Sequence, residues 1–426
     1  MTKNTDHLGR PIVVVTGIGV LTSLGQGKEA NWTALTSGVS GIRRITRFPT
    51  AGMRTTIAAT VDFVSVDDMS APALSERIAD LVIQEAISEA GIGAKGDFPG
   101  PLFLALPPVE IEWPQREALA AASGANETVA YDDLLRAAGT GQFGAYYERF
   151  LFGSVAEHLA DRFGTKGSPI ATSTACASGG TAIQLGVEAI RRGESNAALV
   201  VGTDASINPE SIIRFSLLSA LSTRNDPPAA SARPFSKDRD GFVMAEGAGA
   251  LVLESLESAR ARGAKILGVI EGCGEAADGF HRTRSSPDGK PIIACMRNAL
   301  ADAGLSPDDI GYVNAHGTGT PENDKMEWVG VSAVFGERAA SIPVSSNKSM
   351  IGHTLTAAGA IEAIFTLMTI SRGVLPPTIN YDTPDPTVPI DCVPNVARPA
   401  TVKHAISNSF GFGGQNVCVV LGAAPQ

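Results

Sequence analysis

A cysteine in a run of small residues is the first feature of this sequence that suggests chemistry. Cys176 lies in the segment Thr172–Gly180, where a short strand leads through a turn of small residues into a helix. The N–H groups and the dipole at the start of a helix stabilise a thiolate, and small neighbours leave room for a substrate. A lone cysteine in an apolar segment is commonly an inert core residue. The location of Cys176 alone therefore supports a role as nucleophile and a role as core residue equally.

Two of the six histidines and one lysine stand in segments of small and polar residues that follow predicted strands. His316 lies in Tyr312–Pro321, and His353 closes Ser345–His353, with Lys348 five residues before it. Either histidine alone would be interpreted as a structural residue with satisfied hydrogen bonds. A cysteine facing two histidines and a lysine, however, suits acyl transfer through a thioester.

An internal repeat brings these residues into equivalent positions. Ser168–Ile170 opens a strand, a turn and a helix ending at Gly193, and Ile342–Val344 opens the same series, ending at Gly373. Counted from the matched prolines, the cysteine lies seven residues on, and the lysine and the second histidine lie five and ten residues on. Two related halves packed about a pseudo-two-fold axis would bring these turns together. The convergence favours catalytic over structural roles.

The order of elements predicts one α/β fold built from two similar halves. Strand-like runs such as Ile12–Thr16 and Ala197–Val201 alternate with helix-length segments whose apolar residues recur at three- and four-residue spacing. We place the halves at 11–263 and 264–426. The first half contains a long insertion over about 93–167, which predicts either a cap or a contact between subunits.

Composition and charge exclude several other classes of protein. The chain has 426 residues, of which 44% are hydrophobic, and 34 Lys and Arg stand against 44 Asp and Glu, for a net charge of −10 at pH 7. This content can fill a large core, and without a basic stripe it offers nucleic acid no binding surface. The longest apolar run, Ala357–Ile370, contains Glu362 and is too short to span a bilayer, so we expect no membrane insertion.

The cysteines and the N-terminal residues indicate in which compartment of the cell the protein works. Five cysteines, odd in number and widely spaced, form no C-x-x-C pair. Free thiols of this kind fit a reducing cytoplasm better than a disulfide-bonded secreted protein. Residues 1–10 are polar and lack the apolar run of a secretory signal, so we expect a cytoplasmic protein.

The remaining histidines and two glycine motifs carry weaker signals. Gly17-Ile-Gly19 follows a strand, but Thr22 occupies the third position of the dinucleotide-binding fingerprint, which excludes that function. Gly411–Gly414 precedes a strand rather than a helix, so it suits a close approach of backbone to a ligand better than a phosphate cradle. The other histidines are interpreted as structural, with the last of them undecided: His7, His158, His404 and His281.

Taken together, these segments resemble the β-ketoacyl-acyl-carrier-protein synthases, the elongating, His-His condensing enzymes of the thiolase-like superfamily. The likeness is dense from Ser168 to Leu421. Its four ordered motifs are Thr174–Gly179, Val313–Pro321, Asn347–His353 and Asn408–Gly414. The resemblance implies a thiolase-like α/β fold in which two pseudo-repeated βα halves form a five-layer αβαβα arrangement.

The resemblance also implies a reaction. An acyl chain held on Cys176 as a thioester would be joined to malonyl-acyl-carrier protein by decarboxylative Claisen condensation, giving a 3-oxoacyl chain in fatty acid elongation. The N–H groups of Cys176 and Phe412 would form an oxyanion hole, worth about 3 kcal/mol per donor in comparable sites. His316 and His353 would hydrogen-bond the malonyl thioester carbonyl and stabilise the enolate that loss of CO2 leaves.

Further residues and partners follow from the same resemblance. Lys348 would order and charge the site, and Phe412 with Phe410 would gate the acyl pocket. The implied supporting residues are Asp324 and Glu362 for the charge network, and Thr318 and Thr320 for the pantetheine arm. No metal or resident cofactor is implied, because acyl carrier protein presents the substrates on phosphopantetheine. The chain would form a homodimer, and the candidate docking residues for the carrier are Arg214, Arg282 and Arg284.

The sequence departs from the family's pattern in places that bear on the substrate. Gln415 and Ile351 stand where the family usually has threonine, and Leu102–Trp113 replaces a glycine-rich stretch near the acyl pocket. A synthase for very long or polyketide chains therefore stays an alternative. The initiating synthases use Cys-His-Asn and a thiolase needs a second catalytic cysteine, whereas Cys418 lies in an apolar strand and is interpreted as core. A non-catalytic chain-length subunit would be expected to lack Cys176.

Overall fold

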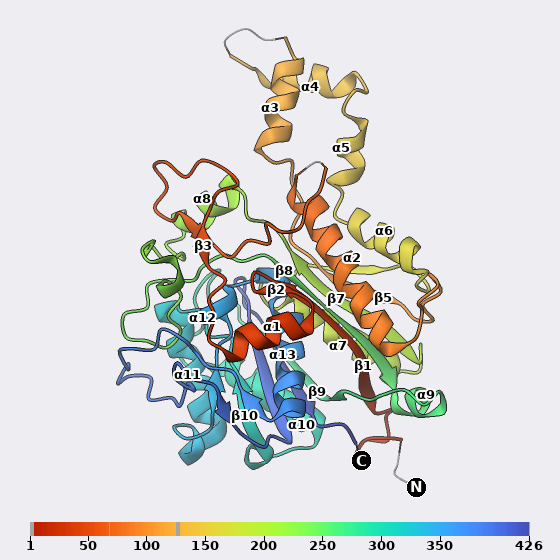
Figure 1. Ribbon diagram of the computed structural model, residues 1–426, viewed down its shortest axis with the longest axis vertical. Helices are drawn as coiled ribbons and strands as arrows, with labels where there is room; N and C mark the ends of the chain where they lie inside the picture. The colour runs from red at the N-terminus through yellow and green to blue at the C-terminus, as the bar shows by residue number, and fades with distance from the viewer. Residues whose placement is uncertain (1–3, 68, 125–127, 426) are drawn as a thin grey trace.

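One continuous mixed β-sheet runs through the molecule and joins its two halves (Figure 1). The computed structural model describes residues 4–67, 69–124 and 128–425, so residues 1–3 of the polar N-terminal segment lie outside the described range. From one edge to the centre, the strands of the first half are β6 (Ile170–Thr172), β5 (Leu102–Ala105), β7 (Ala197–Asp204), β8 (Gly247–Ser255) and β1 (Val13–Thr22). The second half continues with β9 (Gly268–Ala277), β15 (Gln415–Gly422), β14 (His404–Phe410), β10 (Ile310–Asn314) and β11 (Val344–Ser345). The short β2 (Gly25–Gln26) pairs with β1.

The two halves have the same strand order and the same pattern of directions. In each, the third strand along the chain lies at the edge and the first lies at the centre. β5 is parallel to β6 and β7, and β10 is parallel to β11 and β14, while the remaining neighbours are antiparallel. The halves meet where β1 and β9 pair antiparallel through Val13–Val15. The topology therefore confirms the repeated order of elements predicted from the sequence.

Helices form three layers that alternate with the two halves of the sheet. In the middle, α7 (Ser178–Arg191) and α13 (Ala358–Arg372) pack against each other and contact strands of both halves. The outer helices are α2 (Ala71–Ala90) and α6 (Ser154–Phe163) on the first half, and α10 (Lys290–Ala303) and α11 (Pro321–Phe335) on the second. This arrangement is the αβαβα order that the resemblance implied.

The middle layer explains the most apolar segment of the chain. The helical run Leu355–Arg372, which a short 3-10 turn extends beyond α13, is long and apolar enough by composition to cross a membrane. In the fold, however, 83% of it is buried inside the protein. Its hydrophobic residues include Ile361 and Ile364, which pack in one cluster with Ile183 and Val187 of α7. The hydropathy of this run thus reflects a core helix enclosed by sheet on both sides.

The glycine pair near the N-terminus serves packing. α2 begins at Ser70, whose hydroxyl accepts a hydrogen bond from the Ala73 N–H, and it ends at Gly91. It crosses β1 so closely that a Cβ on Gly17 would lie 2.0 Å from the Ala86 carbonyl oxygen. Gly19 meets the Val82 oxygen at the same distance. The motif that resembled a nucleotide site is therefore the contact surface for this helix.

The insertion of the first half forms an arm that projects from the body (Figure 1). The arm contains α3 (Trp113–Ala122), α4 (Tyr131–Gly139) and α5 (Gly144–Arg149), after which α6 returns to cover the sheet. It exposes large side chains, with Tyr131 74% and Tyr147 76% accessible. The other short elements are α1 (Lys28–Thr36), β3 (Arg43–Arg44), β4 (Ile57–Ala58), α8 (Pro209–Leu217), α9 (Leu256–Ala261), α12 (Lys348–Ile351), β12 (Val374–Leu375) and β13 (Arg398–Pro399).

We expect Gly179→Ala to destabilise the fold by about 1–3 kcal/mol, as overpacking of a core does. A Cβ at this position of α7 would lie 2.5 Å from the backbone nitrogen of Ala360 in α13, so one helix must move. Gly139→Ala on α4 is the matched control, because its Cβ would meet no atom within 4 Å. Urea unfolding measures both. Equal midpoints for the two variants would contradict the close contact.

Candidate active site

Cys176 lies in a tight turn between β6 and α7. The preceding Ala175 has a φ of 50°, a left-handed conformation that is uncommon for a residue with a Cβ. The Ser178 side chain closes the turn, because its hydroxyl accepts a hydrogen bond from the Thr174 N–H at 2.7 Å and donates to the Ala175 carbonyl at 2.6 Å. Strained turns of this kind persist where the surrounding structure fixes them, often at active sites. Only 8% of the cysteine is exposed.

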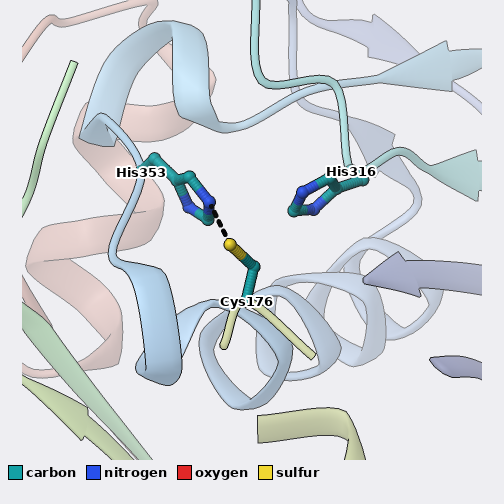
Figure 2. A group of neighbouring side chains, drawn as sticks. All are labelled: Cys176, His316 and His353. Carbon is teal, nitrogen blue, oxygen red and sulfur yellow. Dashed lines mark hydrogen bonds between the residues drawn. The ribbon is translucent and has the colours of Figure 1, made fainter. Parts of the chain in front are cut away.

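His353 is held against this cysteine from the second half. It follows α12, and its Nε2 lies 3.0 Å from the Cys176 Sγ, as Figure 2 shows. The Leu355 N–H donates to its Nδ1 at 3.3 Å. Because Nδ1 accepts, the proton of the neutral ring must sit on Nε2. His353 therefore presents an N–H donor to the sulfur.

His316 lies on the other side of the sulfur, on the loop that follows β10 (Figure 2). Its ring meets the His353 ring edge to face, with centroids 5.2 Å apart. The buried Glu327 holds the loop, since its two carboxylate oxygens accept the N–H groups of His316 at 2.8 Å and Gly317 at 2.7 Å. The Nδ1 of His316 is buried without a hydrogen-bond partner among the described residues, and the residue lines the larger of the two cavities that meet at Cys176.

Burial keeps these three groups uncharged. Burial and the nearby charge of Lys348 hold the pKa values of His316 and His353 well below 6.5. Burial also raises the pKa of the Cys176 thiol to about 11, although the Phe412 N–H and Lys348 act in the opposite direction. The sequence indicated a helix start that favours the thiolate, but removal of the sulfur from water raises the pKa and favours the neutral thiol.

A fully buried ion pair lies behind the histidines. Lys348, 1% exposed, donates to the Glu362 carboxylate on α13, itself 1% exposed. Burial raises the pKa of Glu362 to about 7, with the Lys348 charge opposing that shift. Breaking a buried pair by removing one partner costs about 3–5 kcal/mol, because the other charge is left uncompensated. The pair thus fixes a cation beside the site.

The sequence suggested that Asp324 supports the charge of Lys348, but in the structure it supports the loop at residues 318–320. It is fully buried and accepts the Phe235 N–H at 2.7 Å and the Gly319 N–H at 3.2 Å, and it lies 3.7 Å from the Arg239 guanidinium. These contacts stabilise the loop that carries the two predicted pantetheine-binding threonines. The Oγ1 atoms of Thr318 and Thr320 lie 2.9 Å apart, hydrogen-bonded to each other.

Two cavities meet at Cys176. The entrance cavity, about 470 Å³, contains both histidines, both threonines and Phe410. The acyl cavity, about 410 Å³, extends from the cysteine to the Pro107–Glu112 segment that leads into the arm. Phe412 lines both cavities, whereas Phe410 lines only the first and packs its ring on His316 at 5.9 Å. Phe215 lines both cavities as well, so Phe215 and Phe412 lie between them.

The rim of the entrance cavity is basic. Exposed Arg282 and Arg284 lie there together with Lys325, which sequence reasoning missed, and with His281. Arg214 instead lines the acyl cavity and pairs with Glu110. The sequence analysis also missed the buried Glu327, because a glutamate inside a helix gives no signal until the fold brings it under a loop.

The other histidines and cysteines have structural surroundings. His158 lies between Glu76 and Glu148, and His404 hydrogen-bonds Glu271 at 2.7 Å. Cys418 is fully buried in β15, as the core interpretation required.

A metal ion would meet an unfavourable field at this site. Ligand atoms of Cys176, His316 and His353 all lie within 4.8 Å of one another, and cysteine and histidine are zinc ligands. The buried ammonium of Lys348, however, lowers the basicity of both imidazoles. The same charge opposes any added cation. We therefore interpret the three residues as a nucleophile with two hydrogen-bonding groups.

The chain matches two protein-family descriptions in succession. Residues 10–96 and 106–259 match the β-ketoacyl synthase N-terminal domain, and residues 267–382 match the β-ketoacyl synthase C-terminal domain. The chain belongs to the β-ketoacyl synthase family. Its reaction is therefore a β-ketoacyl synthase condensation, and its architecture is the thiolase-like fold.

Relatives of this synthase fall into two groups. It is 38% identical over 424 residues to 3-oxoacyl-[acyl-carrier-protein] synthase 2 of Synechocystis sp., covering 97% of this chain and 99% of the other. It is 37% identical over 424 residues to a putative polyketide β-ketoacyl synthase of Streptomyces cyaneus, covering 96% and 97%. Among solved structures, a type II polyketide ketosynthase in complex with its acyl-carrier protein matches with a TM-score of 0.86, 33% identity and coverage of 97% and 100%.

We expect Glu327→Gln to reduce the pH dependence of stability between pH 4.5 and 7. Burial raises the pKa of Glu327 from 4.5 to about 7, so in this window the folded protein keeps a proton that the unfolded chain has released. The group therefore makes stability fall as pH rises, by at most about 1.4 kcal/mol per pH unit. Urea unfolding at several pH values measures the slope. The exposed Glu117→Gln serves as control, and identical slopes for Glu327→Gln and the parent protein would contradict this assignment.

Proposed function

We propose that this synthase joins malonyl-acyl-carrier protein to an acyl chain held on Cys176, releasing CO2 and forming 3-oxoacyl-acyl-carrier protein in fatty acid chain elongation. The observation that carries the proposal is the position of the Cys176 Sγ. It lies 3.0 Å from the Nε2 of His353, at the point where the two cavities meet. One cavity can then hold the acyl chain while the other admits the malonyl thioester.

In the first step, the Cys176 sulfur attacks the acyl thioester of the carrier, and the carrier thiol leaves with the proton that the cysteine gives up. The N–H groups of Cys176 and Phe412, which both stabilise negative charge at this sulfur, are suited to receive the thioester oxygen as it becomes an oxyanion. The acyl chain then occupies the acyl cavity, and Phe412 lies between it and the entrance.

In the second step, the C–C bond to the malonyl carboxylate breaks and its electrons form an enolate, as CO2 leaves. His353 presents Nε2–H toward this region, and the His316 ring lies beside it in the same cavity. Both can donate to the enolate oxygen. The enolate carbon then attacks the acyl carbonyl, the Cys176–acyl bond breaks, and the sulfur recovers a proton.

Lys348 gives this site its positive field. Burial, reinforced by this charge, keeps both imidazoles neutral, so that they act as donors without themselves becoming charged. The same charge favours the enolate and the departing thiolate, because both are negative. Asp324 holds the loop of Thr318 and Thr320, which we propose to contact the pantetheine arm.

The chain also carries features that support two of its expected partners. Arg282, Arg284 and Lys325 at the entrance give a predominantly acidic protein a local basic rim, which suits an acidic acyl carrier protein. Among the described residues, β6 at the sheet edge pairs only with β5, so its outer side is open to a second copy in a homodimer. All five cysteines are free thiols, in keeping with a cytoplasmic protein.

The presence of Cys176 favours a catalytic subunit over a non-catalytic chain-length subunit. A second candidate for the substrate, an oxygenated chain of the kind polyketide synthases handle, is favoured by one observation. Serine, threonine, asparagine and acidic side chains line the acyl cavity alongside its apolar residues. A plain alkyl chain would gain less from such a lining than from an apolar one.

We expect Cys176→Ala to abolish condensation, because no sulfur remains to carry the acyl chain. Cys176→Gln, whose side-chain amide resembles the acylated cysteine, should still release CO2 from malonyl-acyl-carrier protein through the two histidines. Product analysis by mass spectrometry and CO2 release measure the two activities. Ketoacyl product from Cys176→Ala would overturn the nucleophile, and a folded Cys176→Gln protein without decarboxylation would overturn the role of the histidines.

We expect the double variant Arg282→Glu, Arg284→Glu to raise KM for malonyl-acyl-carrier protein by about tenfold or more and to weaken its salt dependence. KM for malonyl-pantetheine, which lacks the carrier protein, should stay unchanged. The double variant Lys265→Glu, Lys403→Glu, at two exposed residues outside both cavities, is the charge-matched control. An equal rise in KM for both substrates would show that the substitutions disturb the active site itself, and it would contradict carrier docking at these arginines.

A further inference from the structure

Part of the acyl cavity is formed by the segment that leads into the arm. Pro107, Pro108, Val109, Glu110 and Glu112 all line the cavity. Under the proposed function, a chain attached to the Cys176 sulfur must run into this cavity. The side chains of this segment are therefore among those that a growing acyl chain meets.

The lining of the acyl cavity is mainly apolar, but it includes several polar side chains. Those with charged or amide groups include Glu110, Glu112, Asp204, Asn208 and Arg214. Asp204 is already satisfied, because its two oxygens accept from Ser206 and Thr356. Arg214 is likewise engaged with Glu110. These pairs leave Glu112 as the carboxylate whose environment needs an explanation.

Glu112 is 6% exposed and lines the cavity. One of its oxygens accepts the Ala71 N–H at 2.5 Å, and Asn208 also stabilises its charged form. Within the described part of the chain, it has no ion-pair partner; the charged groups that act on it are two further carboxylates, Glu210 and Glu110. Both oxygens of Glu210 are buried without a hydrogen-bond partner. Burial, with these neighbours, raises the pKa of Glu112 to about 7.

A plain alkyl chain would make this arrangement worse. It would exclude water from the lone pairs of Glu112 that Ala71 and Asn208 leave open, and it would offer no hydrogen bond in return, which is unfavourable for a buried polar group and more so for a charged one. A chain that carries a hydrogen-bond donor at this depth would remove that cost. We propose that the acyl cavity is a binding site for a hydroxylated acyl chain, with Glu112 accepting the hydrogen bond of the chain hydroxyl.

The hydroxyl fits this position better than other polar groups. With a pKa near neutrality, Glu112 is present both as carboxylate and as carboxylic acid. A hydroxyl can donate to the first and accept from the second, so it is satisfied in both forms. A keto oxygen only accepts and therefore needs the acid, whereas an ammonium group only donates and needs the carboxylate.

The test uses synthetic pantetheine thioesters as acyl donors, which avoids any dependence on carrier docking. The intact protein is mixed with decanoyl-pantetheine or with hydroxydecanoyl-pantetheines that carry the hydroxyl at carbon 6, 8 or 10, and the Cys176 adduct is weighed over time. We expect at least one hydroxylated donor to acylate about tenfold or more faster than decanoyl, because a site that hydrogen-bonds a substrate hydroxyl rejects the analogue that lacks it.

Variants of Glu112 test whether this residue causes the preference for hydroxylated donors. Glu112→Leu should remove the preference or reverse it, while Glu112→Gln, which keeps hydrogen-bonding groups of the same shape, should retain part of it. Glu117→Leu is the matched control, because Glu117 is an exposed carboxylate five residues along α3 and lies outside the cavity. Circular dichroism and urea unfolding check that each variant is folded.

The outcomes separate this proposal from the proposed function. Equal acylation by all four donors, or a preference that survives Glu112→Leu, overturns the hydroxyl site and leaves the condensing role intact. Loss of the preference in Glu117→Leu as well overturns the assignment to Glu112. If no donor forms an adduct on Cys176 in the folded parent protein, the proposed function fails together with the site.

Discussion

The close contact between the two central helices is the constraint on which the active site depends. At Gly179 and Gly359 the backbones of α7 and α13 approach so closely that neither position has room for a side chain. The turn before α7 carries Cys176, and the segment before α13 carries Lys348 and His353. Fixing the two helix starts against each other therefore fixes the distance between sulfur and imidazole. Neither half of the chain contains this set alone.

Water exclusion gives the same site its electrostatic character. The ammonium group of Lys348 pairs with Glu362, while burial keeps the thiol and both imidazoles around it neutral. A site of this kind holds little negative charge at rest. Its positive charge and its hydrogen-bond donors therefore stabilise the reacting state, in which negative charge develops, more than the resting state. That difference between resting and reacting states is what lowers a barrier. One buried ion pair thus makes the two neutral histidines effective hydrogen-bond donors.

The repeated order of elements was predictable because strand, turn and helix recur with matching prolines and terminal glycines, and the shared topology follows from it. The meeting of Cys176 with His353 was predictable for the same reason. The neutral state of the cysteine was not, since burial depends on all surrounding layers and outweighs a local helix effect. Glu327 and Glu112 were missed because each gains its role from a loop or a cavity that distant segments complete. The failed nucleotide fingerprint left Gly17 without a role, and only the path of α2 reveals that it serves packing.

The central position of β1 has a consequence for how the protein is made. This strand is fully buried, yet its partners are β8, which ends at Ser255, and β9, which begins at Gly268. Ribosomes add about 5–20 residues per second, so β1 waits on the order of ten seconds or longer for its neighbours. During that time an apolar strand lacks both of its long neighbours and has only the short β2 and the helices made before β8, such as α1 and α2, to cover it. Synthesis of the first half therefore depends on shielding that strand, by its own helix or by a chaperone, until the sheet can close around it.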